Sequence, residues 1–284
     1  MRLILTIVAA VLDAFDPPFM QRGLLVGLVL AVPLGLVGTW VVLRALAFFT
    51  HAVGVGTFPG VVVGLGVPAV GPFLGALAAA GLITAAVAGV ERDERVRGGA
   101  VTGLVLSTAM AVGAILLTSA FALSTPVDAV LFGSLLAATV DDVERAAVVA
   151  VVALVAVLFL SQRLESATFD RAWSASAGAR PILTEALLLG LIAATVVVAL
   201  PIVGSLLVSG LLVLPAATAR LMAGSASTMP LVASALAALE ITVGLALARE
   251  LDAPPGAVIC ALAGLGFAGA LLVERALAAR GQPS

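Results

Sequence analysis

Long runs of apolar residues without a single charged side chain dominate this sequence. The uninterrupted runs are residues 24–43, 52–90, 98–127, 186–219, 221–239 and 253–273. A bilayer crossing needs about 20 apolar residues, so the two longest runs can each hold a tight pair of crossings. Each crossing is expected to be helical because lipid tolerates no unpaired backbone groups. The pattern predicts an all-α fold, a polytopic transmembrane helical bundle.

Charged residues, Pro and Gly divide these runs into nine predicted crossings within one transmembrane domain, residues 1–284. The predicted crossings are 19–43, 52–69, 71–90, 98–122, 141–162, 181–200, 202–221, 229–248 and 256–275. Segments that begin near Pro59 and Pro201 are short or broken, so eight crossings are almost equally well supported. Residues 1–18 carry acidic Asp13 and Asp16 after a short apolar stretch, and we expect them to form an interfacial segment.

The composition excludes several classes of protein. Hydrophobic residues make up 62% of the chain and charged residues 11%, whereas a soluble domain carries about 25% charged residues. A soluble enzyme, a nucleic-acid binder and a disordered protein are therefore excluded. The chain has no Lys, so it contains no G-x-x-x-x-G-K-[ST] loop for ATP. We expect a non-enzymatic membrane protein that binds no cofactor of its own.

All 14 basic residues are Arg, and their placement predicts the orientation. If Arg44 is cytoplasmic, ten Arg residues fall on the cytoplasmic side, and only Arg2, Arg22, Arg145 and Arg249 fall outside. Basic residues concentrate in cytoplasmic loops. The C-terminus is therefore expected in the cytoplasm. Small-residue pairs such as Gly60/Gly64 and Gly71/Gly75 predict closely packed helices.

The polar segment 163–180 is too long for a simple turn between crossings. Phe169 and Asp170 can begin a short amphipathic helix with Asp170 as its N-cap, and Gly178 can end it. Phe169 and Trp173 would then be exposed. From the residues alone, a docking site for another protein and a helix resting on lipid headgroups are equally well supported.

Two ionisable residues within apolar runs are candidates for the transport pathway. His51 is the only His of the chain, and it follows Phe48 and Phe49. Glu240 lies mid-crossing, where an isolated carboxylate is costly unless it faces the bundle interior or a cavity. The alternative for Glu240 is a structural pair with Arg220 or Arg249. Three further residues are expected to interrupt helices, namely Pro59, Gly60 and Pro215.

From about residue 19 to residue 275 the chain resembles the ABC-3 group, the permeases of bacterial ABC importers for zinc, manganese and iron. The segments that carry the resemblance are Phe19-Met20-Gln21-Arg22-Gly23-Leu24, Gly38-Thr39-Trp40-Val41-Val42-Leu43-Arg44, Phe58-Pro59-Gly60-Val61-Val62-Val63-Gly64, Leu131-Phe132-Gly133-Ser134-Leu135-Leu136, Thr168-Phe169-Asp170-Arg171-Ala172, Val203-Gly204-Ser205-Leu206-Leu207-Val208, Leu212-Val213-Leu214-Pro215-Ala216-Ala217-Thr218-Ala219 and Pro254-Pro255-Gly256-Ala257.

This resemblance implies a permease fold related to that of the vitamin B12 importer, in a bacterial inner membrane. It implies a homodimer or a pair of permeases, cytoplasmic ATPase subunits that use ATP, and an extracytoplasmic metal-binding protein. It also implies that the loop matching residues 165–180 contacts the ATPase, which favours docking over lipid contact for this segment.

The sequence departs from the family pattern near residues 47–60. That pattern, Asp-x-x-x-His-Ala-x-x-Pro-Gly, places an Asp and a His on one helix face. An ungapped alignment puts His51 at the Asp position and Val55 at the His position, whereas a four-residue gap puts His51 at the His position and Ala47 at the Asp position. The pair is broken either way. A lone imidazole needs further ligands, and Glu240, Asp128, Glu185 and backbone carbonyls are the candidates.

Two other functions compete with a metal importer. A stand-alone secondary transporter would require several intramembrane carboxylates, and Glu240 alone is thin support for it. An ABC permease for a non-metal substrate would explain the altered pair. If a metal is the substrate, an imidazole in place of a carboxylate favours Zn²⁺ over Mn²⁺.

Overall fold

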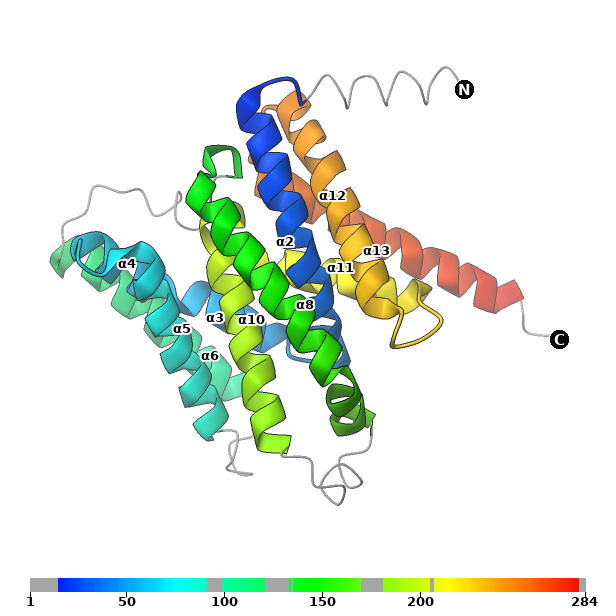
Figure 1. The fold of residues 1–284 in the computed structure, drawn as a ribbon, viewed down its shortest axis with the longest axis horizontal. Helices are drawn as coiled ribbons and strands as arrows, with labels where there is room; N and C mark the ends of the chain where they lie inside the picture. Colours follow the sequence, from blue (N-terminus) through cyan, green and yellow to red (C-terminus); the bar gives the residue numbers. More distant parts are fainter. Residues whose placement is uncertain are drawn as a thin grey trace.

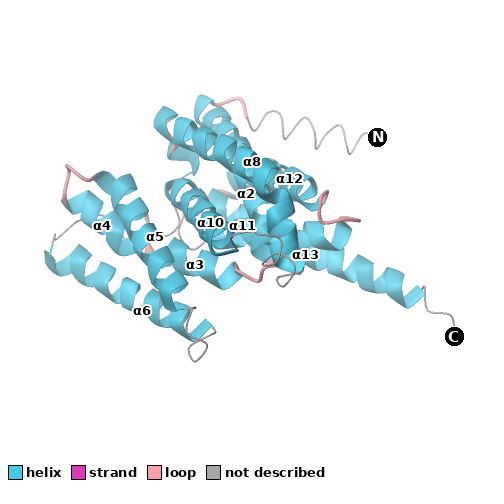
Figure 2. Cartoon of the chain, turned by 60° about the horizontal axis from the view of Figure 1, so that its bottom comes forward, coloured by secondary structure: helices cyan, strands magenta, loops and turns pink. Residues whose placement is uncertain are grey.

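The computed structural model describes residues 15–90, 99–120, 133, 135–169, 181–204 and 207–280. Throughout these ranges the secondary structure is helical, with no strand (Figure 2). The helices form an elongated bundle in which α4, α5 and α6 lie at one side and α12 and α13 at the other, with α2, α8 and α10 between them (Figure 1). The predicted interfacial segment 1–18 lies almost wholly outside the described residues.

The helices follow the predicted crossings in order. Their bounds are α2 Pro18–Leu43, α3 Ala47–Gly56, α4 Phe58–Gly66, α5 Gly71–Val90, α6 Gly99–Ile115 with a π-helical turn Leu116–Ala120, a 3₁₀ turn Leu135–Ala137, α8 Val140–Phe169, α10 Pro181–Val203, α11 Val208–Met222, α12 Met229–Leu251 and α13 Pro255–Arg280.

Within the described ranges, seven helical segments are long and apolar enough to cross a membrane. The apolar stretches Gly71–Val87 in α5 and Val208–Met222 in α11 are shorter. These two stretches correspond to two of the nine predicted crossings. The all-helical membrane bundle is confirmed, and the short α11 explains why eight crossings and nine were hard to distinguish.

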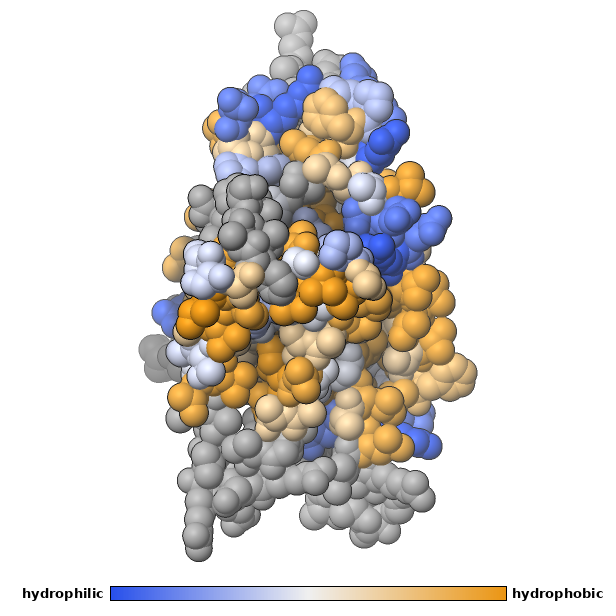
Figure 3. Space-filling model, turned by 90° about the vertical axis from the view of Figure 1, so that its left-hand side faces the viewer, coloured by the Kyte–Doolittle hydropathy of each residue, from blue (hydrophilic) through white to orange (hydrophobic). Residues whose placement is uncertain are grey.

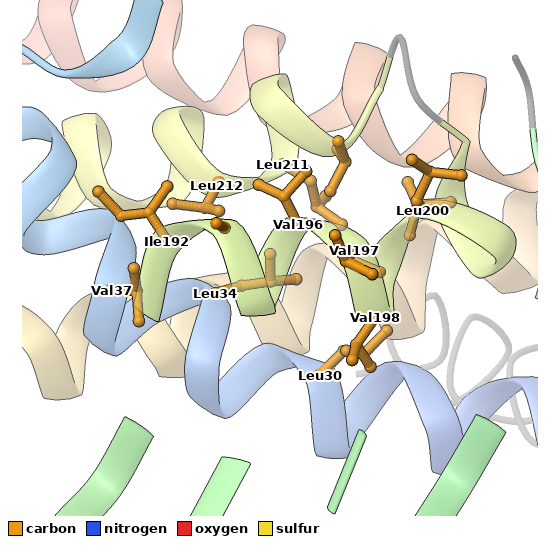
Figure 4. Close-up of a cluster of buried hydrophobic side chains, with 14 of the residues drawn as sticks. Leu30, Leu34, Val37, Ile192, Val196, Val197, Val198, Leu200, Leu211 and Leu212 are labelled. Atoms are coloured by element: carbon orange, nitrogen blue, oxygen red, sulfur yellow. The ribbon is translucent and has the colours of Figure 1, made fainter. Parts of the chain in front are cut away.

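A cluster of buried side chains lies where α2, α10 and α11 meet (Figure 4). Leu30, Leu34 and Val37 of α2 point toward Ile192 and the Val196–Val198 stretch of α10, and Leu211 and Leu212 of α11 close the cluster. β-branched and Leu side chains fill such an interior with few voids because their rotamers are well defined. This core holds α11 in place, which matters for the site described below.

Glycine pairs bring α4 and α5 into backbone contact. A Cβ on Gly60 would overlap the carbonyl of Gly75, and one on Gly64 would overlap the carbonyl of Gly71. The pairs Gly60/Gly64 and Gly71/Gly75, one on each helix, predicted close packing, and each contact joins one glycine of the first pair to one of the second. Without a hydrophobic force between helices in lipid, this close approach supplies the van der Waals contact that joins them.

Replacing Gly60 by Ala is expected to cost about 1–3 kcal/mol of stability, because the added methyl forces α4 and α5 apart. Gly81→Ala is the matched control, since a Cβ at Gly81 meets nothing within 4 Å. Thermal unfolding of the two purified variants in detergent measures the difference. Equal melting temperatures for both variants would contradict the close packing.

Proline has different effects at two positions. The helix is interrupted at Thr57, and Pro59 lies in the first turn of α4, where its missing N–H costs no bond. At Pro215 the structure differs from the sequence-based expectation, because α11 runs through this residue without ending. Buried among packed helices, Pro215 removes one backbone bond, and the flanking packing keeps the helix together.

Helix α8 begins with a capping box and ends later than predicted. The backbone N–H of Thr139 donates to Asp142, and the N–H of Asp142 donates to the Thr139 hydroxyl. The helix continues through Phe169, past the expected end at residue 162. Leu164 is 2% exposed, and the Thr168 hydroxyl bonds the Leu164 carbonyl, so tertiary packing holds this polar last turn in helical form.

Apolar side chains cover much of the outer surface. On the face shown in Figure 3, hydrophobic residues gather across the middle and hydrophilic ones toward the upper end. Large exposed apolar residues also line the outer side of α8, among them Val148, Leu158 and Phe159. Such a band is expected where lipid tails replace water as the solvent.

Candidate functional site: a histidine at the contact of α3 and α11

His51 lies on the second turn of α3 and reaches α11. Its Nδ1 is 3.1 Å from the hydroxyl of Ser209, across a sequence separation of 158 residues. The imidazole is half-buried, and α3 and α4 together form one of the membrane-crossing segments, Ala47–Gly66. The pair therefore lies within the crossing part of the protein.

Two glycine turns fix where α11 begins. Gly204, with φ of +96°, ends α10, and Gly133, with φ of +63°, packs directly on it. Both backbone conformations are easily reached only by Gly, and a Cβ on Gly133 would overlap the Gly204 N–H. These two turns belong to the Gly-Ser segments that carry the family resemblance. They position the first turn of α11, and with it Ser209, opposite His51.

The hydrogen bond engages Nδ1 of His51, and the tautomer of the ring sets whether Nδ1 or the Ser209 hydroxyl donates. When Nδ1 carries the proton it donates to the Ser209 oxygen, and Nε2 keeps a free lone pair. Metal-binding His residues commonly use this arrangement, because the second nitrogen is held by a hydrogen bond that fixes the tautomer. Val55, one turn further along α3, is buried and offers no ligand. The site thus provides one oriented imidazole without the carboxylate partner of the family pattern.

Glu240 lies on α12, and its carboxylate reaches toward α13. The residue is 6% exposed, and Oε2 is buried without a hydrogen-bond partner. Oε1 lies 3.9 Å from the position a Cβ would take on Gly266. The alternative pairing with Arg220 or Arg249 is therefore not formed at Oε2, and both Arg residues are exposed near the ends of their helices.

His51 and Glu240 lie at different helix interfaces, His51 between α3 and α11 and Glu240 between α12 and α13. The α3 helix packs on α5, α6, α10 and α11, whereas α12 packs on α2, α11 and α13. Neighbouring residues of α11 face the two sides, since Ser209 meets His51 and Gly210 lies against Cys260 of α13. Within the described ranges, no three His, Cys, Asp or Glu side chains lie close enough together to hold a metal ion.

The other proposed ligands and docking residues are only partly described. Glu185 lies in the second turn of α10, half-buried, and Asp128 falls outside the described residues. Of the docking residues, Phe169 ends α8. Asp170, Trp173 and Gly178 lie outside the described residues, so the short amphipathic helix stays a prediction.

Ser209 was not identified from the sequence. It is one of few polar residues in the segment 202–221, and it follows directly on the segment Val203–Val208 that carries the resemblance. A hydroxyl in an apolar helix usually bonds its own backbone. The sequence therefore gives no signal for its contact with His51.

The chain is similar to known transport proteins over almost its whole length. It is 28% identical to the manganese import system permease protein ScaB of Streptococcus parasanguinis, over 85% of each chain. It is 28% identical to the chelated iron transport system membrane protein YfeC of Yersinia pestis, over 90% of this chain and 86% of that protein. Among solved structures, PsaBC from Streptococcus pneumoniae in complex with Fab matches with a TM-score of 0.82 and 25% identity, over 93% of this chain and 95% of that chain.

The model of the ABC 3 transport family matches residues 16–274. This range includes His51, Ser209 and Glu240, and it covers the described bundle from before α2 to near the end of α13. The chain is a multi-pass membrane protein that belongs to the ABC 3 transport family.

Proposed function

We propose that this chain is the permease subunit of an ABC importer that carries a divalent metal ion into the cytoplasm. The observation that carries the proposal is the oriented imidazole of His51, held by Ser209 between two helices of the membrane-crossing bundle. Relatives over most of the chain, a manganese import permease and a chelated iron transport protein, support a metal as the cargo.

The proposed assembly contains two permeases, two cytoplasmic ATPase subunits and an extracytoplasmic metal-binding protein. ATP is bound and hydrolysed by the ATPase subunits, since this chain lacks the Lys of a P-loop. The Arg distribution supports a cytoplasmic location for the C-terminus and for residues 163–180. Residues 163–180 then lie on the side from which an ATPase can dock.

The cargo is Mn²⁺, Fe²⁺ or Zn²⁺. Imidazole nitrogen suits Zn²⁺ and Fe²⁺, and carboxylate oxygen suits Mn²⁺. Because His51 stands without a carboxylate on its helix face, the site favours Zn²⁺ more than an Asp/His pair does. A single imidazole leaves the remaining ligands of the ion to water and backbone oxygens, which suits an ion that must leave again.

Metal uptake by proteoliposomes that hold the complete complex tests this function. ATP inside the vesicles reaches the ATPase, and the binding protein is added outside. Accumulation of Mn²⁺, Fe²⁺ and Zn²⁺ is then measured ion by ion. Uptake that requires both ATP and the ATPase subunits supports the proposal. Uptake by the permease alone, driven by a proton or sodium gradient, would instead identify a secondary transporter.

Replacing Phe169 or Trp173 by Glu is expected to abolish co-purification of the ATPase or to uncouple ATP hydrolysis from uptake. A charge placed at the centre of an apolar contact costs several kcal/mol unless it is paired. Trp173→Phe is the control, since it keeps an aromatic surface. If both Glu variants keep the ATPase bound and their hydrolysis coupled, residues 163–180 do not form the docking surface.

A further inference from the structure

Arg44 at the end of α2 holds the last turn of α8. Its Nε donates to the Thr168 hydroxyl at 3.0 Å, and its Nη2 donates to the Leu164 carbonyl at 3.3 Å. The Thr168 hydroxyl donates in turn to the same carbonyl at 2.5 Å. One guanidinium therefore contacts two linked acceptors, more than a hundred residues away in sequence. We call these three residues the Arg44 clasp.

The turn that follows Arg44 is tightly bonded. The N–H of Leu46 donates to the Val41 carbonyl at 2.8 Å, and that of Ala45 donates to the Val42 carbonyl at 3.3 Å. Ala45 adopts a left-handed conformation with φ of +56°. This bond pattern closes the C-terminus of a helix with little freedom. The end of α2 and the start of α3 therefore move together, and a force on Arg44 reaches α3.

His51 follows on the second turn of α3, so the clasp lies a short distance along the chain from the candidate metal site. At its other end, Arg44 donates to Leu164 and Thr168, which form the last described turn before residues 170–180. The clasp joins the end of α2, which leads through Ala45 and Leu46 into α3, to the last described turn of α8.

We propose that Arg44 is a positioning residue that transmits movement of the docking segment to α3 and its His51. The inference rests on the proposed function, because it takes residues 163–180 as the ATPase contact. When the ATPase displaces the end of α8, the clasp carries α3 with it and changes the geometry between His51 and Ser209. Metal release is thereby tied to the ATP cycle.

The clasp needs the shape of arginine. A guanidinium is a rigid planar fork whose donors are fixed relative to one another, so two bonds to α8 transmit rotation as well as displacement. A Lys ammonium on a flexible stem makes a point contact that can pivot. The half-buried setting of Arg44 also limits screening by salt.

The test uses the complete complex in proteoliposomes and measures two rates, ATP hydrolysis and metal uptake. For Arg44→Gln we expect hydrolysis within about twofold of wild type and a fall of about tenfold in metal moved per ATP, as for loss of a residue that orients a metal ligand. The metal moved per ATP by Arg44→Lys should lie between the values for wild type and Arg44→Gln. The metal moved per ATP should fall less in Thr168→Val, which removes one of the two bonds of Arg44. Combining it with Arg44→Gln should add nothing, because Arg44→Gln already removes that bond. Arg275→Gln, an exposed Arg of α13, is the control.

A second readout follows α3 itself. Phe48 lies on the first turn of α3 and is 46% exposed, so Phe48→Cys in a Cys260→Ala background reports the position of this helix through its rate of maleimide labelling. With the clasp intact, trapping the ATPase with vanadate should change this rate. In Arg44→Gln the change should disappear. A residue needed only for folding would lower yield and stability without altering the nucleotide response.

The possible outcomes separate the two claims. If the wild-type complex moves no metal with ATP, the proposed function fails, and the role of Arg44 fails with it. If wild type transports and Arg44→Gln keeps both its metal-per-ATP ratio and its nucleotide-dependent labelling, only the clasp is refuted. Should Arg44→Gln not assemble, Arg44→Lys and Thr168→Val decide the same question by the same two readouts.

Discussion

His51→Ala is expected to lower ATP-driven metal uptake by about 100-fold, because losing a ligand costs at least as much as losing the group that orients it, itself worth about 10–100-fold. The variant removes the only imidazole of the chain and leaves the Ser209 hydroxyl without this partner. Ser209→Ala should cost less, about tenfold, since the ring remains and only its orientation is lost. Uptake by the complete complex, ion by ion, measures both effects.

The choice of ion should change when the carboxylate is restored. His51→Asp, with or without Val55→His, rebuilds parts of the family pair on one face of α3. A carboxylate about 4 Å from a unit positive charge gains about 4 kcal/mol at an effective dielectric of 20, and more from a dication. We expect the ratio of Mn²⁺ to Zn²⁺ uptake to rise in His51→Asp.

Thr50→Ala is the matched control for these variants. Thr50 adjoins His51, but its hydroxyl bonds Leu46 of its own helix turn. Its uptake and ion preference should match those of wild type. Unchanged uptake and ion preference in His51→Ala would show that His51 is not a ligand. Selectivity would then belong to the extracytoplasmic binding protein.

Glu240→Leu is expected to stabilise the protein by about 1–3 kcal/mol. A buried polar atom without a partner carries about this desolvation cost, which an apolar side chain of similar size removes. Glu240→Gln should change stability little, because the amide beside Gly266 would lack a hydrogen-bond partner just as the carboxylate does. Chemical unfolding of the purified chain in mild detergent measures the three stabilities.

Glu250→Leu serves as the control for Glu240→Leu. Glu250 lies exposed near the end of the same helix, so its replacement should change stability by no more than about 0.5 kcal/mol. A loss of stability in Glu240→Leu would show that the carboxylate makes a favourable contact. Uptake by the same variant tests the prediction that Glu240 meets the metal, since a carboxylate on the ion's route cannot be replaced by Leu without loss.

The positions of the helices could be predicted because the bilayer imposes them. A charge-free run such as 24–43 has few alternatives to a crossing, and α2 follows it closely. Close helix packing at Gly60, Gly64, Gly71 and Gly75 could also be predicted, since small residues at a four-residue spacing form a local pattern. The end of α8 could not be predicted. Leu164 and Thr168 are held in helical form by packing and by Arg44, which lies at the end of α2.

The site could be predicted only in part, because its contacts join residues that lie far apart in the sequence. His51 was identifiable as the single His in an apolar run, but its partner lies 158 residues away on α11. Glu240 stood out as an isolated carboxylate, yet the sequence could not show that α12 turns it toward Gly266 of α13. Pro215 was expected to interrupt a helix and does not, because its surroundings are packed tightly enough to hold α11 together.

The most direct measurement is pulsed electron paramagnetic resonance of Mn²⁺ bound to the purified permease, prepared without a histidine tag. Because the chain contains one His, any imidazole nitrogen coupled to the manganese must belong to His51. We expect a nitrogen modulation in wild type, its loss in His51→Ala and its retention in Thr50→Ala. Bound Mn²⁺ without nitrogen coupling in wild type, or with the same coupling in His51→Ala, would contradict the assignment of His51 as a metal ligand.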